Sequence, residues 1–161
     1  MAERNRLLNA AKTFCEAFGR GEELPVVLSH FCKDAYILEH GLPLPQLPYL
    51  GKKFTGIDED GEDTSTSTLA DYFKLVGKYL NIENEPVWGG WTIDCGDAEG
   101  AETDRAAAIV SCKGEATFLN RRTGKKWDET VIYRMELDGG GRIKVLEIWA
   151  DSLSAYLATQ K

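Results

Sequence analysis

The stretch KWDETVIYRMELDGGGRIKVLEIWAD (residues 126–151) decides the fold class, because apolar and polar residues alternate along both of its halves. Alternation with a period of two is typical of β-strands that bury one face. The glycines of GGGR (residues 139–142) predict a tight turn between the two halves. The stretch therefore predicts an antiparallel hairpin of two long strands.

The same period extends toward the N-terminus of this hairpin. PVWGGWTID (residues 86–94) and RAAAIVSCKGEATFLN (residues 105–120) predict two further strands, and RRTGK (residues 121–125) predicts the turn into the hairpin. An acidic, glycine-rich segment, CGDAEGAETD (residues 95–104), is expected to connect the first two strands. Four strands in this order predict an antiparallel meander.

The N-terminal half shows helical periods instead. Apolar residues recur at three- and four-residue steps over positions 7–18, and a shorter helix is expected to follow. A third helix is expected from Thr68, where Asp71 completes a capping pattern. DAYILEHG (residues 34–41) predicts one early strand. This order predicts an α+β fold with helices on one face of a curved sheet.

Two irregular segments interrupt this order. Residues 42–61 hold three of the five prolines of the chain, which predicts a stiff, ordered loop. GIDEDGEDTSTST (residues 56–68) is acidic and rich in hydroxyl groups, and is the segment most expected to be mobile. No repeat or linker is found, so residues 1–161 are expected to form a single domain.

Composition narrows the classes of partner. The 161 residues carry a net charge of −7, which disfavours nucleic acid and anionic membranes as partners. The first twelve residues lack the apolar segment of a signal peptide, and no apolar run is long enough to span a membrane. Four widely spaced cysteines are expected to be reduced, and two histidines offer no zinc-ligand spacing. We therefore expect a cytoplasmic protein without a metal ion.

Two local patterns carry a resemblance to a known family. They are SHFCKDAYILEHGLPLP (residues 29–45), a helix-to-strand entry, and GGGRIKVLEIWADSL (residues 139–153), a glycine turn with a last strand and a closing aspartate. Together with the element order they resemble the nuclear transport factor 2-like superfamily, and within it the SnoaL-like branch of polyketide cyclases. Limonene epoxide hydrolase and ketosteroid isomerase are enzymes of the same superfamily. The resemblance implies a cone-shaped fold, in which N-terminal helices pack on a strongly curved antiparallel sheet that encloses a pocket.

The resemblance places Glu39 where ketosteroid isomerase holds its general base. Alternation puts Ile37 on the same strand face as Glu39, so Ile37 is expected to contact a bound substrate. A carboxylate at an apolar pocket mouth would have a raised pKa and could transfer a proton near neutral pH. The alternative is a strand-end glutamate that faces water. His40 could act as a second acid or base, or could be a turn residue bonded to the backbone.

Glu129 is a third catalytic candidate, because its strand face is otherwise apolar and should be buried. The residues on that face are Trp127, Glu129, Val131, Tyr133, Met135 and Leu137. A carboxylate there needs a partner or a function, the alternatives being a buried ion pair or a strand end that reaches solvent. Tyr133 could bind substrate and donate to an oxyanion, although core packing is the simpler interpretation.

The last strand is apolar on both faces, which predicts a pocket on one side and a homodimer contact through the sheet on the other. Trp149 is a candidate pocket wall on this strand, and Tyr49 in the proline-rich loop is expected to cover the pocket mouth. Lys113 and Glu115 come close to the Arg-x-Asp pair of limonene epoxide hydrolase. Ile148 stands where that family has a second aspartate, so epoxide hydrolysis is in doubt. A surface salt bridge is the favoured interpretation of Lys113 and Glu115.

The chemistry that remains is acid–base chemistry. The sequence contains no glycine-rich phosphate loop, nucleophile elbow or HExxH motif, so no cofactor is expected. We expect a cofactor-independent isomerase, cyclase, dehydratase or hydrolase that acts on a small hydrophobic, ring-containing metabolite. The alternative is a non-catalytic small-molecule-binding or dimeric scaffold module of the same fold.

Overall fold

The computed structural model describes residues 1–57, 67–95 and 106–161. The expected mobile loop (56–68) and the expected connection (95–104) therefore lie almost entirely outside the described residues. The helices are α1 (Ala2–Gly19), α2 (Leu24–Leu28), α3 (Leu69–Tyr79) and α4 (Ser152–Ala158). The strands are β1 (Phe31–His40), β2 (Lys53–Thr55), β3 (Leu80–Ile82), β4 (Val87–Cys95), β5 (Ala108–Asn120), β6 (Lys126–Leu137) and β7 (Ile143–Trp149).

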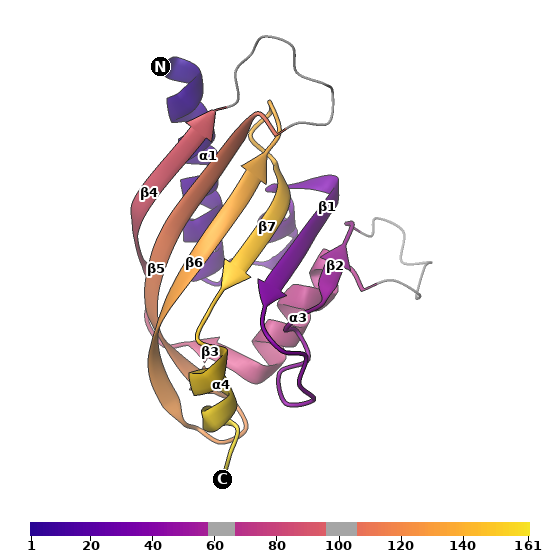
Figure 1. Ribbon diagram of the computed structural model, residues 1–161, viewed down its shortest axis with the longest axis vertical. Helices are drawn as coiled ribbons and strands as arrows, with labels where there is room; N and C mark the ends of the chain where they lie inside the picture. The colour runs from indigo at the N-terminus through magenta and orange to yellow at the C-terminus, as the bar shows by residue number, and fades with distance from the viewer. Residues whose placement is uncertain (58–66, 96–105) are drawn as a thin grey trace.

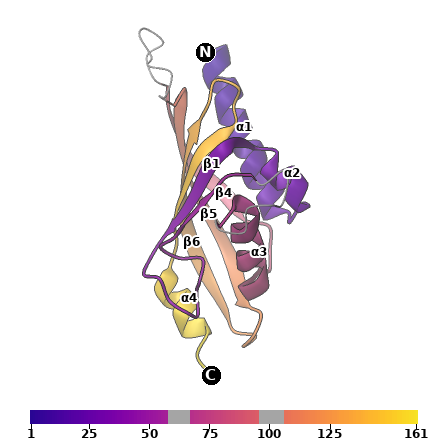
Figure 2. The same ribbon diagram turned by 90° about the vertical axis from the view of Figure 1, so that its right-hand side faces the viewer.

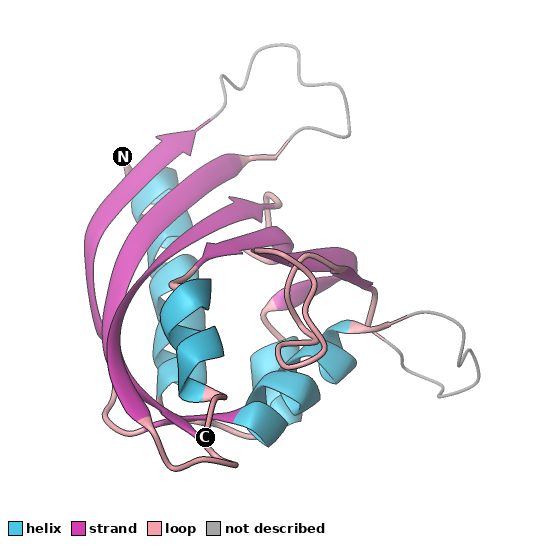
Figure 3. Ribbon diagram, turned by 60° about the horizontal axis from the view of Figure 1, so that its bottom comes forward, coloured by secondary structure: helices cyan, strands magenta, loops and turns pink. Residues whose placement is uncertain are grey.

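One strongly curved sheet holds all the strands, in the order β2-β1-β7-β6-β5-β3, with β4 also paired to β5 (Figure 1). Helices α1, α2 and α3 lie together on one side of the sheet (Figure 2). The sheet curls toward the helices, which gives the molecule a half-barrel shape (Figure 3). The expected α+β architecture, with N-terminal helices on a strongly curved sheet, is confirmed.

The sheet is antiparallel except at one pair, because β1 runs parallel to β7. The expectation of a fully antiparallel sheet is corrected at this pair. Alternation along DAYILEHG shows which residues share a face but not which strand lies alongside. The parallel pair needs no tight turn, since the whole of residues 41–142 connects β1 to β7.

The expected start of the third helix is confirmed in detail. The Asp71 backbone N–H donates to Thr68 Oγ1 at 3.3 Å, and the Thr68 N–H donates to Asp71 Oδ2 at 3.0 Å. This reciprocal pair satisfies two N–H groups that a helix start leaves without partners.

The C-terminal segment after β7 forms a short helix. Residues 152–158 form α4, which begins where the Asp151 side chain accepts the Ser154 N–H at 3.0 Å. The helix is held at its other end by the Thr123 hydroxyl, which donates to the Ala158 carbonyl at 2.6 Å.

Over the residues that are described, no helix is long and apolar enough to cross a membrane.

The core lies between α1 and the concave face of the sheet. Leu7, Ala11, Phe14 and Cys15 of α1 are all buried, as the helical period predicted. Tight contacts also form within the sheet: a Cβ atom at Gly114 would lie 2.5 Å from the ring of Trp88. The indole of Trp88 therefore packs against a strand position that only glycine can occupy without a shift.

Candidate active site

A small internal cavity lies at the concave face of the sheet, beneath α3 and α4. Its volume is about 40 Å³, and we call it the inner cavity. Most of its lining is apolar, but six of the lining residues carry a titratable oxygen. They are Glu39, Tyr49, Tyr72, Glu129, Tyr133 and Asp151.

Strand register brings Glu39 and Tyr133 together. Glu39 of β1 pairs with Ile148 of β7, and Ile148 pairs with Tyr133 of β6. The three residues therefore form one row across three strands, and all three line the inner cavity. The pattern of alternation correctly predicted that the row of Tyr133 faces inward, whereas the inward position of Glu39 was implied only by the family resemblance.

Glu39 is the most perturbed carboxyl group of this cavity. Its side chain is 7% exposed, and the Tyr72 hydroxyl donates to Oε2 at 2.7 Å. Burial raises the pKa of Glu39 to about 8, because the carboxylate loses its water, and the charge of Glu129 adds to this rise. The hydrogen bond from Tyr72 acts against it. Both the acid and the carboxylate are therefore accessible near neutral pH, so Glu39 can take up and release a proton.

Glu129 is held differently. The Trp127 indole N–H donates to Oε2 at 2.5 Å, and the Asp151 backbone N–H donates to Oε1 at 3.1 Å. Burial raises the pKa of Glu129, while these two hydrogen bonds oppose the rise. Both oxygens are thus occupied, and Glu129 ties β6 to the start of α4. Among the described residues, Oε1 of Glu39 has no such donor.

Two further tyrosines face the same space. Burial raises the pKa of Tyr49 and of Tyr133, and the nearby carboxyl groups of Glu39 and Glu129 add to it. Both phenols therefore stay protonated. Neither hydroxyl hydrogen-bonds to another described residue, so each is free to donate to a bound molecule.

A larger pocket adjoins the inner cavity. This outer pocket has a volume of about 460 Å³ and lies between the end of α1, α2, α3 and the β3–β5 edge of the sheet. Four apolar side chains border both spaces: Phe18, Val76, Leu80 and Phe118. A ring in the outer pocket would therefore be separated from Glu39 by side chains only.

Comparisons with known proteins identify the fold. Neither a protein-family model nor a curated protein sequence matches the chain. Solved structures do match. TerC, crystallised with polyporic acid, aligns with a TM-score of 0.67 and 10% identity, over 96% of this chain and 98% of TerC. A nuclear transport factor 2-like protein from Burkholderia xenovorans aligns with a TM-score of 0.65 and 16% identity, over 98% of both chains.

The fold is similar to that of solved nuclear transport factor 2-like proteins. A ketosteroid isomerase-like protein from Erwinia carotovora atroseptica also aligns, with a TM-score of 0.59 and 18% identity over 92% of this chain and 96% of that one. Further matches include proteins described as SnoaL-like polyketide cyclase and as epoxide hydrolase/cyclase-like. The likeness to this superfamily that the sequence indicated is confirmed at the level of the fold.

Within this nuclear transport factor 2-like fold, three of the predicted site residues lie away from the inner cavity. Ile37 is buried in the core, but it does not line the cavity. His40 lies on the opposite face, where Nε2 is 3.0 Å from Glu147 Oε1 and the ring stacks on Trp149 with centroids 4.3 Å apart. Trp149 is 41% exposed there. Because side chains alternate along β7, the cavity wall is formed by Ile148 instead.

Tyr72 was not among the site residues predicted from the sequence, although its hydroxyl contacts Glu39. The indication was present, because a buried tyrosine needs a partner for its hydroxyl.

Lys113 and Glu115 form the expected surface salt bridge, with Nζ and Oε1 2.6 Å apart. Over the described residues, no group of three or more His, Cys, Asp or Glu side chains could hold a metal ion.

Proposed function

We propose that the protein is a cofactor-independent acid–base enzyme that acts on a small hydrophobic, ring-containing molecule. The observation that carries this proposal is the carboxyl group of Glu39, which is buried, has a pKa raised to about 8, and has one oxygen open to the inner cavity. A group with a pKa near the working pH is suited to both proton abstraction and proton return.

The geometry suggests how the steps divide. Ionised Glu39 takes a proton from the substrate through Oε1, while Tyr72 holds Oε2 at 2.7 Å and keeps the carboxylate oriented. The hydroxyl groups of Tyr49 and Tyr133 donate to the oxygen on which negative charge develops. Protonated Glu39 then returns the proton to a second atom of the substrate. Isomerisation, cyclisation and dehydration all use this pair of transfers.

Glu129 has a supporting role in this scheme, because both of its oxygens accept hydrogen bonds from the protein. Its charge raises the pKa of Glu39, and its bond to the Asp151 N–H fixes the start of α4 above the cavity. His40 has no place in the scheme, since it lies on the other face of the sheet. The neighbours with isomerase-like and cyclase-like descriptions support acid–base chemistry on this fold without defining the substrate.

One observation favours the alternative, a binding module without catalysis. The inner cavity of about 40 Å³ offers space for about one water molecule, so a ring cannot enter it without side-chain movement. A molecule confined to the outer pocket would then bind without contact to Glu39. The two functions differ in whether the bound ring exchanges a proton.

Hydrogen exchange into a simple ring ketone tests the proposal. We expect the protein to accelerate deuterium incorporation from D₂O at the α-carbon of 2-tetralone, measured by proton NMR, with a rate that rises with pH around 8. Glu39→Gln should lower the acceleration by about 100-fold, the usual scale of general base catalysis. Glu23→Gln, an exposed glutamate, is the matched control. Binding of 2-tetralone without any acceleration would favour the binding module and would overturn the proposed enzyme.

A further inference from the structure

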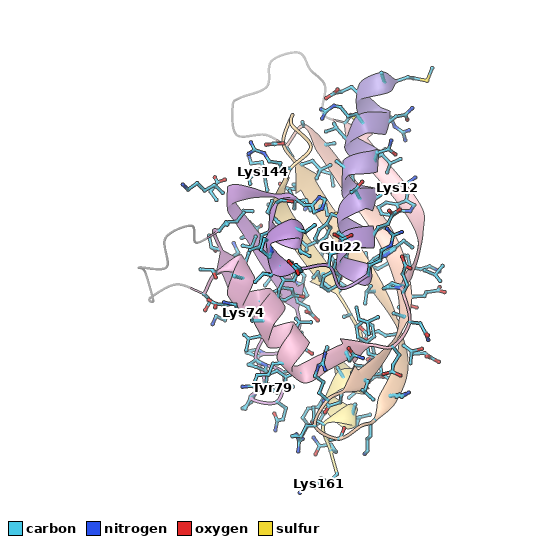
Figure 4. All side chains as sticks on the ribbon, turned by 180° about the vertical axis from the view of Figure 1, so that it is seen from behind. Lys12, Glu22, Lys74, Tyr79, Lys144 and Lys161 are labelled. Atoms are coloured by element: carbon cyan, nitrogen blue, oxygen red, sulfur yellow. The ribbon has the colours of Figure 1, made fainter. Side chains whose placement is uncertain are left out.

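The outer pocket is apolar inside and charged at its edge. Phe73, Val27 and Ile82 are among the apolar residues of its wall. Four charged side chains complete its lining: Arg20, Glu22, Lys74 and Arg121. Figure 4 views this side of the molecule and labels Glu22, just beyond the end of α1, and Lys74 on α3.

The cations of this edge are not equally neutralised. Arg20 is paired, because its Nε is 3.0 Å from Glu85 Oε1 and its terminal nitrogen Nη2 is 3.9 Å from Glu16 Oε2. Arg121 and Lys74 have no carboxylate partner among the described residues. The lining also holds one carboxylate without an ion pair in the described part of the chain, Glu22, so the unpaired groups of this edge, two cations and one anion, sum to a charge of +1 in a chain whose net charge is −7.

Arg121 is also held in place. Its Nε donates to the Leu80 carbonyl at 3.0 Å, and one terminal nitrogen donates to Asn81 Oδ1 at 3.2 Å. Both acceptors are neutral groups of β3, so they orient the guanidinium without compensating its charge. An arginine has five N–H donors, and the remaining three are arranged for a two-point contact with a carboxylate.

We infer that the ligand is a ring-bearing carboxylic acid whose carboxylate binds Arg121. The inference rests on the proposed function, since it names the substrate class for the same site. The ring lies in the outer pocket against Phe73 and Phe118, and Lys74 adds positive potential at the edge. The opposite end of the ligand then points toward Leu80 and Val76. These two side chains separate the outer pocket from the inner cavity, where Glu39 lies. Arg121 is therefore a specificity-determining residue, and it takes no part in the proton transfer.

Two probes of nearly the same shape test this inference. 2-Naphthoate carries a carboxylate, and 2-naphthamide replaces it with a neutral amide. We expect the wild-type protein to bind 2-naphthoate about fivefold more tightly than 2-naphthamide at low salt, the range of a partly exposed ion pair. The preference should shrink as salt is added. Dissociation constants are measured by fluorescence titration at pH 7.

Variants separate the role of Arg121 from general charge effects. Arg121→Gln should abolish the preference for 2-naphthoate, and binding of 2-naphthamide to this variant shows that the pocket is intact. Arg121→Lys should keep part of the preference, because the charge remains without the two-point geometry. Lys125→Gln is the matched control, since it removes an exposed cation outside the pocket lining and should change neither affinity.

The outcomes distinguish the inference from the proposed function. If the wild type shows no preference, or if Arg121→Gln retains it, the acid is not bound by Arg121 and the inference fails. The proposed function then stands, because 2-naphthamide still occupies the pocket. If neither probe binds, the outer pocket does not accept a ring and the inference fails together with the proposed ring-binding site.

Discussion

Replacing Glu39 with glutamine should make the stability of the protein less dependent on pH. The pKa of this carboxyl is raised from 4.5 to about 8 by folding, because burial disfavours the charged form. A carboxyl whose pKa is raised by folding contributes its full stability at pH values below its pKa in the unfolded chain. This contribution is lost as the pH rises to the pKa of the group in the folded protein. Between pH 5 and pH 9 this loss amounts to about 4 kcal/mol, at 1.36 kcal/mol per pKa unit.

Glutamine keeps the shape of the side chain and cannot ionise. Its carbonyl oxygen can still accept a hydrogen bond from the Tyr72 hydroxyl, which is 2.7 Å from Glu39 Oε2 in the wild type. We therefore expect Glu39→Gln to be within about 1 kcal/mol of the wild type at pH 5. At pH 9 the variant should be more stable than the wild type by several kcal/mol.

Urea unfolding at pH 5, 7 and 9 measures this difference. The comparison of variant and wild type at each pH removes the contributions of all other titrating groups. Glu23→Gln, on the surface before α2, provides the control and should show no pH-dependent difference. If Glu39→Gln and the wild type lose stability in parallel from pH 5 to pH 9, the carboxyl is not buried as an acid, and the proposed proton transfer loses its basis.

Three further predictions concern neighbouring features. Tyr72→Phe removes a hydrogen bond that lowers the pKa of Glu39, so we expect a loss of about 1–2 kcal/mol in urea unfolding and a shift of the 2-tetralone exchange profile to higher pH. Gly114→Ala places a Cβ atom 2.5 Å from the Trp88 ring, and the forced shift should cost about 1–3 kcal/mol in the same assay. Trp149 is 41% exposed on the convex sheet face, where a homodimer is expected. Sedimentation of the wild type should show a dimer that Trp149→Glu converts to the 17.9 kDa monomer, and a wild-type monomer would contradict the expectation.

Part of the site was predictable because alternation is a local property. The row of Glu129 and Tyr133 on β6 was expected to face inward, and both residues are buried. The same rule placed Ile37 and Glu39 on one face of β1, but only the family resemblance indicated that this face is the inward one, as it is. The start of α3 was predictable too, since the Thr68 cap needs only residues within one helical turn.

What the sequence could not show is which strands lie next to each other. The row of Glu39, Ile148 and Tyr133 depends on the parallel pairing of β1 with β7, between residues more than one hundred positions apart. The last strand is apolar on both faces, so its pattern did not reveal that Ile148 faces the cavity and Trp149 faces outward. Tyr72 was missed for a related reason, because a helical period locates a buried face without naming the carboxylate that faces it.

The two buried acids of the inner cavity have different roles because their hydrogen bonds differ. Glu129 accepts two N–H groups, from Trp127 and Asp151, and such donors favour the ionised form. Glu39 accepts only the Tyr72 hydroxyl, so fewer hydrogen bonds oppose the rise that burial causes in its pKa. The charge on Glu129 then raises the pKa of Glu39 further, which keeps its proton available near neutral pH. In the proposed mechanism, the negative charge of Glu129 therefore moves the pH range in which Glu39 exchanges a proton with a bound ring to higher values.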